Sequence, residues 1–262
     1  MVLSPAVILD WLAFGLFVMC GLAATSVAGQ RGGPPQAPAT AKAAAPIDLT
    51  GYWASVVTED WRYRMTTPSK GDVAGVPLNA AGRQAAGAWD PARDETAGET
   101  CKPYGAAGIM RMPGRLHVTW QDEETLRIEL DAGTQTRTLS FRAPRTEGGD
   151  WQGVSMASWD RSDSPMARGG FFPGATARGG SLKVLTTRMK PGYLRRNGVP
   201  YSADAVMTEY FDRFDVPNGD ALLVVSTELV DPTYLATPFW TSTHFKKQND
   251  ASGWHPTPCS VR

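Results

Sequence analysis

The stretch from Lys190 to Lys246 reads KPGYLRRNGVPYSADAVMTEYFDRFDVPNGDALLVVSTELVDPTYLATPFWTSTHFK, and it decides the fold of the chain. It holds three runs rich in Val, Thr, Phe and Tyr, residues that favour strands. These runs are Ala205–Phe214, Ala221–Val230 and Phe239–Lys246. The turn-forming sequence DVPNG joins the first two runs, and DPTY joins the second and third. We therefore predict an antiparallel meander of three strands.

Similar runs fill much of the chain before this stretch, with turn residues between them. We predict further strands at Asp48–Thr58, Trp61–Met65, Arg115–Gln121, Thr125–Leu130, Thr134–Phe141, Trp151–Trp159 and Leu182–Met189. One segment favours a helix instead: Leu78–Trp89 is rich in Ala, and Asn79 can cap its first turn. The segment from Pro91 to Gly108 is predicted to be a long loop.

Gly51-Tyr52-Trp53, at the head of the first predicted strand, resembles the start of lipocalins and related calycin barrels. In those barrels the Trp closes the bottom of the barrel. The chain shows no alternation of strands with helices, which argues against a parallel sheet. We predict an all-β fold: an antiparallel, closed or nearly closed lipocalin- or calycin-like barrel of about ten strands with one short helix. A β-sandwich is the alternative.

The N-terminal residues predict export. Trp11–Thr25 is an apolar core, and Ser26-Val27-Ala28 supplies the small residues before a cleavage site. We therefore divide the chain into a signal peptide (1–28), a disordered linker rich in Ala, Pro and Gly (29–46) and a single barrel domain (47–262). An uncleaved membrane anchor is the alternative for the first segment. We expect an exported protein, periplasmic or secreted, without stable membrane insertion after cleavage.

Two cysteines remain after the predicted cleavage, Cys101 and Cys259. In an oxidising compartment, two cysteines most simply form one disulfide. Two buried thiols are the alternative, and the absence of a neighbouring CxxC or CxxH motif argues against a metal site.

The balance of positive and negative side chains limits the classes of partner that we expect for this protein. The chain carries 26 basic and 26 acidic side chains. Because a general nucleic-acid binder needs a basic face, we expect no nucleic-acid partner.

The segment 161–180 contains ARGG twice but lacks the GK[ST] motif of a phosphate-binding loop, so we interpret it as a mobile loop. No motif indicates a cofactor, and nothing in the sequence indicates an oligomeric state.

Three side chains are candidates for catalysis. Glu209 lies on the same side of its predicted strand as Met207 and Phe211, and a carboxylate among apolar neighbours can act as a general acid or base. His117 and His244 lie on predicted strands and would meet it across a barrel. The alternative for Glu209 is a salt bridge, for instance to Arg127 or Arg188. No H-x-H or H-E-x-x-H pair is present, so we predict no metal site.

Aromatic side chains on the predicted strands are candidates for contacts with a flat or apolar ligand. The alternative is that they fill the core. The predicted ligand-binding residues are Trp53, Trp61, Arg64, Trp120, Tyr210 and Trp240.

Two residue patterns link the chain to other proteins. The first is G-x-P-x-S, then T-E-x-F-x-R, then D-P-x-x-x-x-x-P-[FW], formed by Gly198, Pro200, Ser202, Thr208, Glu209, Phe211, Arg213, Asp231, Pro232, Pro238 and Phe239. The second is W-D-P, then C-x-P-x-G and I-M, formed by Trp89, Asp90, Pro91, Cys101, Pro103, Gly105, Ile109 and Met110. The chain thereby resembles a large group of uncharacterised exported bacterial proteins, although Tyr201 stands where many relatives have His. The resemblance covers residues 78–246 and implies a shared fold and export, but no activity and no role for any residue.

Three functions are consistent with these patterns. The first is an exported barrel that binds a small hydrophobic or aromatic molecule. The second is a cofactor-independent isomerase, hydratase or lyase that uses Glu209 with His117 or His244. The third is a structural envelope protein without a pocket. Convergence of Glu209 with a histidine in a wide pocket would favour the enzyme, and a filled barrel would count against both of the first two.

Overall fold

The computed structural model of the chain describes residues 39–143, 149–160, 176–177 and 180–261. The predicted signal peptide, residues 29–38 of the predicted linker and most of the segment 161–180 lie outside these residues. From Ala39 onward the chain forms one compact unit. Among the helices in the described ranges, none combines the length and the apolar character needed to cross a membrane.

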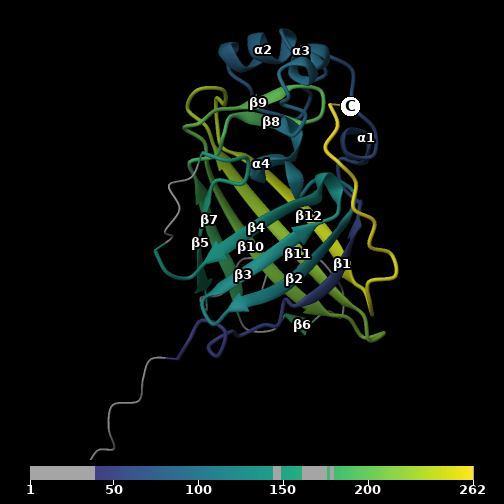
Figure 1. Cartoon of the computed structure of the whole chain (residues 1–262), viewed down its shortest axis with the longest axis vertical. Coiled ribbons are helices and arrows are strands. Elements are labelled where there is room, and N and C mark those ends of the chain that lie inside the picture. The colour runs from purple at the N-terminus through teal and green to yellow at the C-terminus, as the bar shows by residue number, and fades with distance from the viewer. Residues whose placement is uncertain (1–38, 144–148, 161–175, 178–179, 262) are drawn as a thin grey trace, which may run out of the picture. The chain divides into compact units, whose positions relative to one another are not determined.

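Nine strands close into a barrel, which confirms the predicted all-β barrel (Figure 1). Their order around the barrel is β11, β12, β1, β2, β3, β4, β5, β7 and β10, and β10 pairs with β11 to complete the ring. The strands are β1 (Gly51–Val56), β2 (Arg115–Asp122), β3 (Thr125–Leu130), β4 (Gln135–Ser140), β5 (Val154–Asp160), β7 (Ser181–Thr187), β10 (Val206–Asp215), β11 (Ala221–Val230) and β12 (Phe239–Lys247). A short strand, β6 (Thr176–Ala177), pairs with the last residues of β10.

The predicted meander forms the closing part of the barrel. Strands β10 and β11 pair from Val206↔Val230 to Asp215↔Ala221, and β11 pairs with β12 in the same antiparallel sense. In the turn after β10, the amide of Val216 donates to the carbonyl oxygen of Asp220 at 2.8 Å. Local turn residues therefore set the register of three neighbouring strands.

One pair of strands departs from the predicted antiparallel arrangement. Strands β4 and β5 run parallel, with Leu139 opposite Ser155 and Ser140 opposite Met156. A parallel pair needs a connection of about a dozen residues or more to return the chain to the same end of the sheet. Residues 141–153 supply that length, so the barrel is mixed.

The predicted strand Trp61–Met65 is wrong, because Trp61–Arg64 forms the short helix α1. Asp60 has left-handed backbone angles, and its carbonyl oxygen accepts hydrogen bonds from the amides of Tyr63 and Arg64. This turn buries Arg64, whereas Trp61 stays 64% exposed. So short an alternation of aromatic and basic residues does not distinguish a strand from a single helical turn.

A cap of short elements covers one end of the barrel (Figure 1). The predicted helix is confirmed as α2, and Asn79 caps it by accepting a hydrogen bond from the amide of Gly82. The segment from Pro91 to Gly108, which is predicted to be a long loop, contains short helices instead. A hairpin of two short strands precedes β10. The cap elements are α2 (Ala80–Gly87), α3 (Pro91–Thr96), η1 (Lys102–Tyr104), α4 (Ala106–Ile109), β8 (Gly192–Arg195) and β9 (Val199–Tyr201). A short 3-10 turn, η2 (Ala132–Thr134), follows β3.

Buried side chains form two cores. The larger core fills the barrel, and the smaller core lies between the barrel end and the cap. In the smaller core, Met207 and Leu229 from the barrel strands pack with Leu194 and Val199 from the cap hairpin. The cap is therefore held to the barrel by apolar contact.

Residues 39–46 of the predicted disordered linker are ordered instead. The hydroxyl of Thr40 donates to the Glu123 carboxylate at 2.9 Å, and Lys42 forms an ion pair with the same group. The indole of Trp159 donates to the carbonyl oxygen of Ala41 at 2.7 Å. Ala and Pro content alone does not reveal these contacts, because their partners lie far along the chain.

The predicted disulfide is confirmed between Cys101 and Cys259, which lie 158 residues apart in sequence. Cys101 precedes η1 in the cap, and Cys259 lies in the C-terminal tail. Before reaching the cap, the tail packs Trp254 beside the rings of Tyr52 and His117. We call residues 248–261 the C-terminal strap.

Loss of this disulfide should lower the free energy of unfolding by about 4–5 kcal/mol, because so long a closed loop strongly restricts the unfolded chain. Urea unfolding of the oxidised and reduced protein measures the difference. A variant with both cysteines replaced by Ala is the control, and reductant should not change its midpoint. Equal midpoints for the oxidised and reduced wild-type protein would contradict the prediction.

Candidate functional site

Side chains from every strand of the ring occupy the barrel interior. The largest are Trp53, Arg137, Phe211 and Phe245, and each is almost completely buried. Each strand sends alternate side chains inward, as strand geometry requires. Among the described residues, these side chains occupy the interior, and that arrangement counts against a ligand site there.

Glu209 points into the barrel, as its predicted strand face indicates, and it forms an ion pair there. Its two carboxylate oxygens accept hydrogen bonds from Arg137 Nη1 at 3.0 Å and Nη2 at 2.5 Å. Both side chains are completely buried. The partner is neither of those suggested by the sequence; Arg127 pairs with Glu129 instead. Because one guanidinium binds both oxygens, we interpret Glu209 as a residue that stabilises the barrel interior.

The buried ion pair continues into a small polar network. Arg137 Nη2 also lies 3.4 Å from the hydroxyl of Thr186, and that hydroxyl lies 2.8 Å from the hydroxyl of Ser155. Hydrogen bonds of this kind offset part of the cost of burying two charges.

His117 lies on the outer wall of the barrel. The neighbouring Leu116 and Val118 point inward, so the alternation of β2 turns His117 outward. Its ring stacks on Tyr52 with a centroid distance of 4.1 Å, and its Nδ1 lies 3.1 Å from the Glu129 carboxylate.

His244 also lies on the outer wall, between the buried Thr243 and Phe245. Its Nδ1 lies 2.8 Å from the hydroxyl of Thr58 and 3.2 Å from the Glu59 carboxylate. The expected convergence of Glu209 with His117 and His244 is therefore absent, because the wall of the barrel separates the carboxylate from both rings.

The predicted ligand-binding residues are divided among four regions. Trp53 lies in the core, where its indole donates to the carbonyl oxygen of Leu49 at 2.8 Å. Trp120 is half-buried beside Phe141 and Trp159. The others are separate from these and do not form one site: Tyr210 and Trp240 lie on the outer wall, and Trp61 and Arg64 lie on α1.

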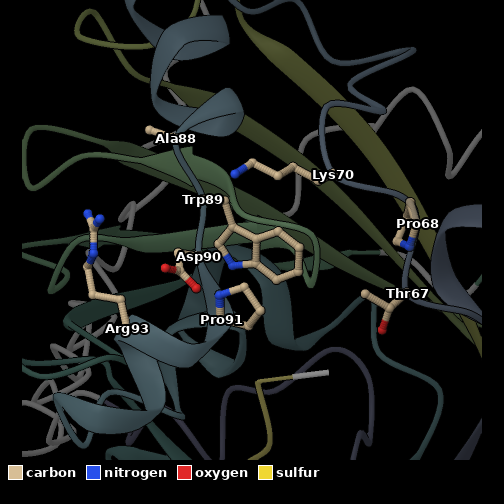
Figure 2. A pocket seen from close by; sticks show the side chains of 8 residues that line it. All are labelled: Thr67, Pro68, Lys70, Ala88, Trp89, Asp90, Pro91 and Arg93. Atoms are coloured by element: carbon tan, nitrogen blue, oxygen red, sulfur yellow. The ribbon is translucent and has the colours of Figure 1, made fainter.

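Two adjoining cavities lie in the cap and share Ala88, Trp89, Asp90 and Arg93. The first, of about 570 Å³, is lined by these residues with Thr67, Pro68, Lys70 and Pro91. Figure 2 shows the Trp89 indole at the centre of this group, with Arg93 on one side and Thr67 and Pro68 on the other. The second, of about 310 Å³, extends to Tyr193, Tyr201 and Tyr234. We call the two cavities together the cap groove.

Two helix caps place Trp89 in this groove. Helix α2 ends before Ala88, and Asp90 begins α3 by accepting a hydrogen bond from the amide of Ala92, with Pro91 in the first turn. Trp89 thus lies in the sharp link between two helices. Its ring packs on the backbone of Gly198, which has a φ of 80° and where a Cβ would fall 2.1 Å from the indole. Only glycine suits both the backbone angle and this close approach.

A charged cluster forms one wall of the cap groove. Asp94 accepts hydrogen bonds from the Tyr193 hydroxyl and from Lys102 Nζ, both at 2.7 Å. Burial and the hydrogen bond to Asp94 raise the pKa of the Tyr193 hydroxyl. Burial lowers the pKa of Lys102, but hydrogen bonds to Asp94 and Glu99 outweigh it and leave the pKa raised. Both groups therefore hold their protons at neutral pH.

Tyr201 is the buried member of the lining, with only 1% of its surface exposed. Its hydroxyl has no hydrogen-bond partner in the described part of the chain. Burial raises the pKa of this hydroxyl, and the charge of Asp150 raises it further. The hydroxyl is packed against the backbone of Gly105 and Gly192, where only a glycine leaves room for it, so Tyr201 supports the floor of the groove from within the cap.

Positive charge lies on the open side of the groove. Lys70 and Arg93 are exposed, and neither forms an ion pair with another residue of the described ranges. They are therefore available to an anionic group at the groove.

Sequence reasoning missed this site, although it quoted several of its residues. Trp89 and Pro91 belong to one of the patterns that carry the family resemblance, and Gly198 and Pro200 belong to the other. The two patterns meet at the groove. Their meeting depends on the position of the cap hairpin, which the sequence patterns did not predict.

Comparisons of the chain with known protein families, with curated proteins and with solved structures found no match. Within the described residues, no group of three or more His, Cys, Asp or Glu side chains is placed to hold a metal ion.

Replacing Glu209 by Ala should lower the free energy of unfolding by about 3–5 kcal/mol, because Arg137 would be left buried without a countercharge. Urea unfolding followed by circular dichroism measures this change. The double variant Arg137→Met/Glu209→Leu is the matched control and should lie within about 1 kcal/mol of the wild type. A Glu209→Ala protein as stable as the wild type would contradict the assignment.

Glu59 should make stability depend on acid pH. Burial raises the pKa of its carboxyl, but hydrogen bonds from His244 and Thr58 and the charge of Arg64 lower it to about 2, against the ordinary 4.5. Because the folded pKa is the lower one, this stabilisation is complete above pH 4.5 and is lost as the pH falls towards 2.

Urea unfolding between pH 5 and 2 should therefore show a steeper loss for the wild type than for Glu59→Gln, by about 1–2 kcal/mol, reduced by solvent screening at this partly exposed site. Glu95→Gln, an exposed change on α3, should follow the wild-type curve. Parallel curves for Glu59→Gln and the wild type would contradict the prediction.

Proposed function

We propose that this protein is an exported binding protein that holds a small aromatic molecule with an anionic group in the cap groove. The observation that carries the proposal is the half-buried Trp89 at the centre of the groove, with Lys70 and Arg93 beside it, neither of which forms an ion pair within the described ranges. The sequence predicts a small hydrophobic or aromatic ligand; the proposal narrows this class to an aromatic molecule, adds an anionic group to it, and moves its site from the barrel interior to the cap.

The shape and lining of the groove support this ligand class. Its two cavities, of about 570 and 310 Å³, fall in the usual size range for small-molecule sites. Trp89, Tyr193 and Tyr234 offer ring faces on which an aromatic molecule can stack. Apolar contact area and a few polar groups are the usual composition of such sites.

The charges and donors of the groove support an anionic group on the ligand. Lys70 and Arg93, both exposed at the groove, supply two cations. Asp90 and Asp94 offset part of this charge, but their carboxylates already accept hydrogen bonds within the cap.

Export is supported by the disulfide, which persists in oxidising compartments and is rare in reducing ones. The pattern of residues 1–28 supports the same destination.

The geometry of the barrel also provides evidence on the two other candidate functions, the enzyme and the structural envelope protein. An enzyme built on Glu209 would need that carboxylate to reach a substrate, and its two oxygens are held by Arg137. The filled interior is what a structural envelope protein would have. The binding measurement below separates that role from ligand binding.

Native purification followed by mass spectrometry of the denatured extract should find a small molecule in stoichiometric amount. Calorimetric titration with indole-3-acetate and benzoate, each beside its uncharged amide, should show binding of the acids. Trp89→Ala should weaken binding at least tenfold, or about 1.4 kcal/mol.

Trp240→Ala is the matched control, because Trp240 is also an aromatic surface residue and lies on the outer wall at 58% exposure. Its affinity should equal that of the wild type. If nothing co-purifies and none of the acids binds, or if Trp89→Ala binds them as the wild type does, the proposal is wrong and the structural role is favoured.

A further inference from the structure

Three buried arginines meet at a second place in the cap. Arg64 comes from α1, Arg111 follows α4, and Arg195 ends β8. Their exposed fractions are 3%, 7% and 6%, so each is more than nine-tenths buried. Arginine is seldom buried unless its charge is paired, and a cluster of three requires an explanation.

Each guanidinium uses only part of its donor set within the protein. Arg64 Nε donates to the carbonyl oxygen of Arg111 at 2.7 Å, and its Nη1 pairs with Glu59. Arg111 Nη2 donates to Asp60 at 2.6 Å. Arg195 Nη1 donates to the carbonyl oxygen of Ala74 at 2.8 Å. These bonds fix the orientation of all three groups.

One donor nitrogen on each arginine stays buried without a partner in the described residues: Arg64 Nη2, Arg111 Nη1 and Arg195 Nε. Leaving a buried charged donor unsatisfied costs more than leaving a neutral one. Three such donors in one cluster call for an acceptor that the described residues do not supply, such as a water or an ion.

A cavity of about 20 Å³ lies against all three arginines, with Tyr63 and Arg196 also in its wall. Among the described residues that line it, none is acidic. Glu59 and Asp60 offset two of the four positive charges, and they bind nitrogen atoms other than the three unpartnered donors. The cavity is therefore a polar space with surplus positive charge.

The arginines also repel one another. Burial lowers the pKa of Arg64 and of Arg195, and the charge of Arg111 lowers each of them further. The negative charge of Glu59 raises the pKa of Arg64, and that of Asp60 raises the pKa of Arg195, so both act against this lowering. A bound anion would relieve this repulsion.

We propose that this arginine cavity binds a small planar oxyanion, such as a carboxylate group, bicarbonate or nitrate. A space of about 20 Å³ is little larger than one water needs, so the cavity admits the oxygen end of a small planar anion more readily than a tetrahedral anion. Planar guanidinium forks match the two oxygens of such a group. The cavity shares no lining residue with the cap groove, so the inference is independent of the proposed function.

The test compares melting temperatures at pH 7.5 and constant ionic strength in chloride, acetate, bicarbonate, nitrate and phosphate. The planar anions at about 50 mM should raise the melting temperature by about 2–4 °C over chloride, since they bind only the folded protein. Phosphate should give a smaller rise. Line broadening of ¹³C-labelled acetate on adding wild-type protein checks binding directly.

Arg195→Gln should abolish the planar-anion effect, because it removes an unpartnered donor without leaving a buried carboxylate unpaired. Arg62→Gln, an exposed change on α1, should keep the effect, and so should Trp89→Ala in the cap groove. If Arg195→Gln does not fold, Arg111→Lys replaces it, since it keeps the charge and loses the fork.

Equal melting temperatures in all five anions, together with an unbroadened acetate signal, would overturn the inference. An effect that Arg195→Gln or Arg111→Lys leaves unchanged would also overturn it, because the anion would then bind elsewhere. Loss of ligand binding at the cap groove with the anion effect intact would refute only the proposed function.

Discussion

Closure of the barrel is the constraint on which the rest of the structure depends. Strand β10 pairs with β7 on one side and β11 on the other, so its register is fixed twice. A shift of one residue would turn every side chain of the strand to the opposite face. Tyr210 would then enter the core, and Glu209 would leave Arg137 buried alone. The ion pair across the barrel is therefore satisfied in a single register, and it links strands that do not pair with each other.

The cavities described above lie at the cap end of the barrel. The cap is assembled from segments that are distant in sequence, and polar contacts secure the joints. Asn79 Nδ2 donates to the carbonyl oxygen of Thr233 at 3.0 Å, and Ser202 donates to Asp231 through its amide at 2.8 Å and its hydroxyl at 2.7 Å. These bonds tie α2 and the β8–β9 hairpin to the connection between β11 and β12. The cap groove is thus supported by the connection between two neighbouring barrel strands.

The sequence predicted what depends on local pattern. Turn residues defined the β10–β12 meander, and the chemistry of an oxidising compartment paired Cys101 with Cys259. Glu209 was placed on the correct face, but its partner was not found, because Arg137 lies on β4, which does not pair with β10. The outward direction of His117 follows from its neighbours on β2; the error lay in assuming that rings on two strands share one interior. The parallel β4–β5 pair, α1 and the cap groove depend on contacts between distant segments, and no local pattern reports those.

The disulfide also sets an order of events. Cys259 follows the last strand of the barrel, and Cys101 precedes the second, so the covalent ring encloses β2 to β12 and leaves out β1. Oxidation therefore has to wait until all the strands have been synthesised. Strand β1 lies between β2 and β12, the first and last strands of that ring, without belonging to it. Strand β1 is thus held by non-covalent contacts with its neighbours. The disulfide restricts the separation of the other barrel strands and of the cap.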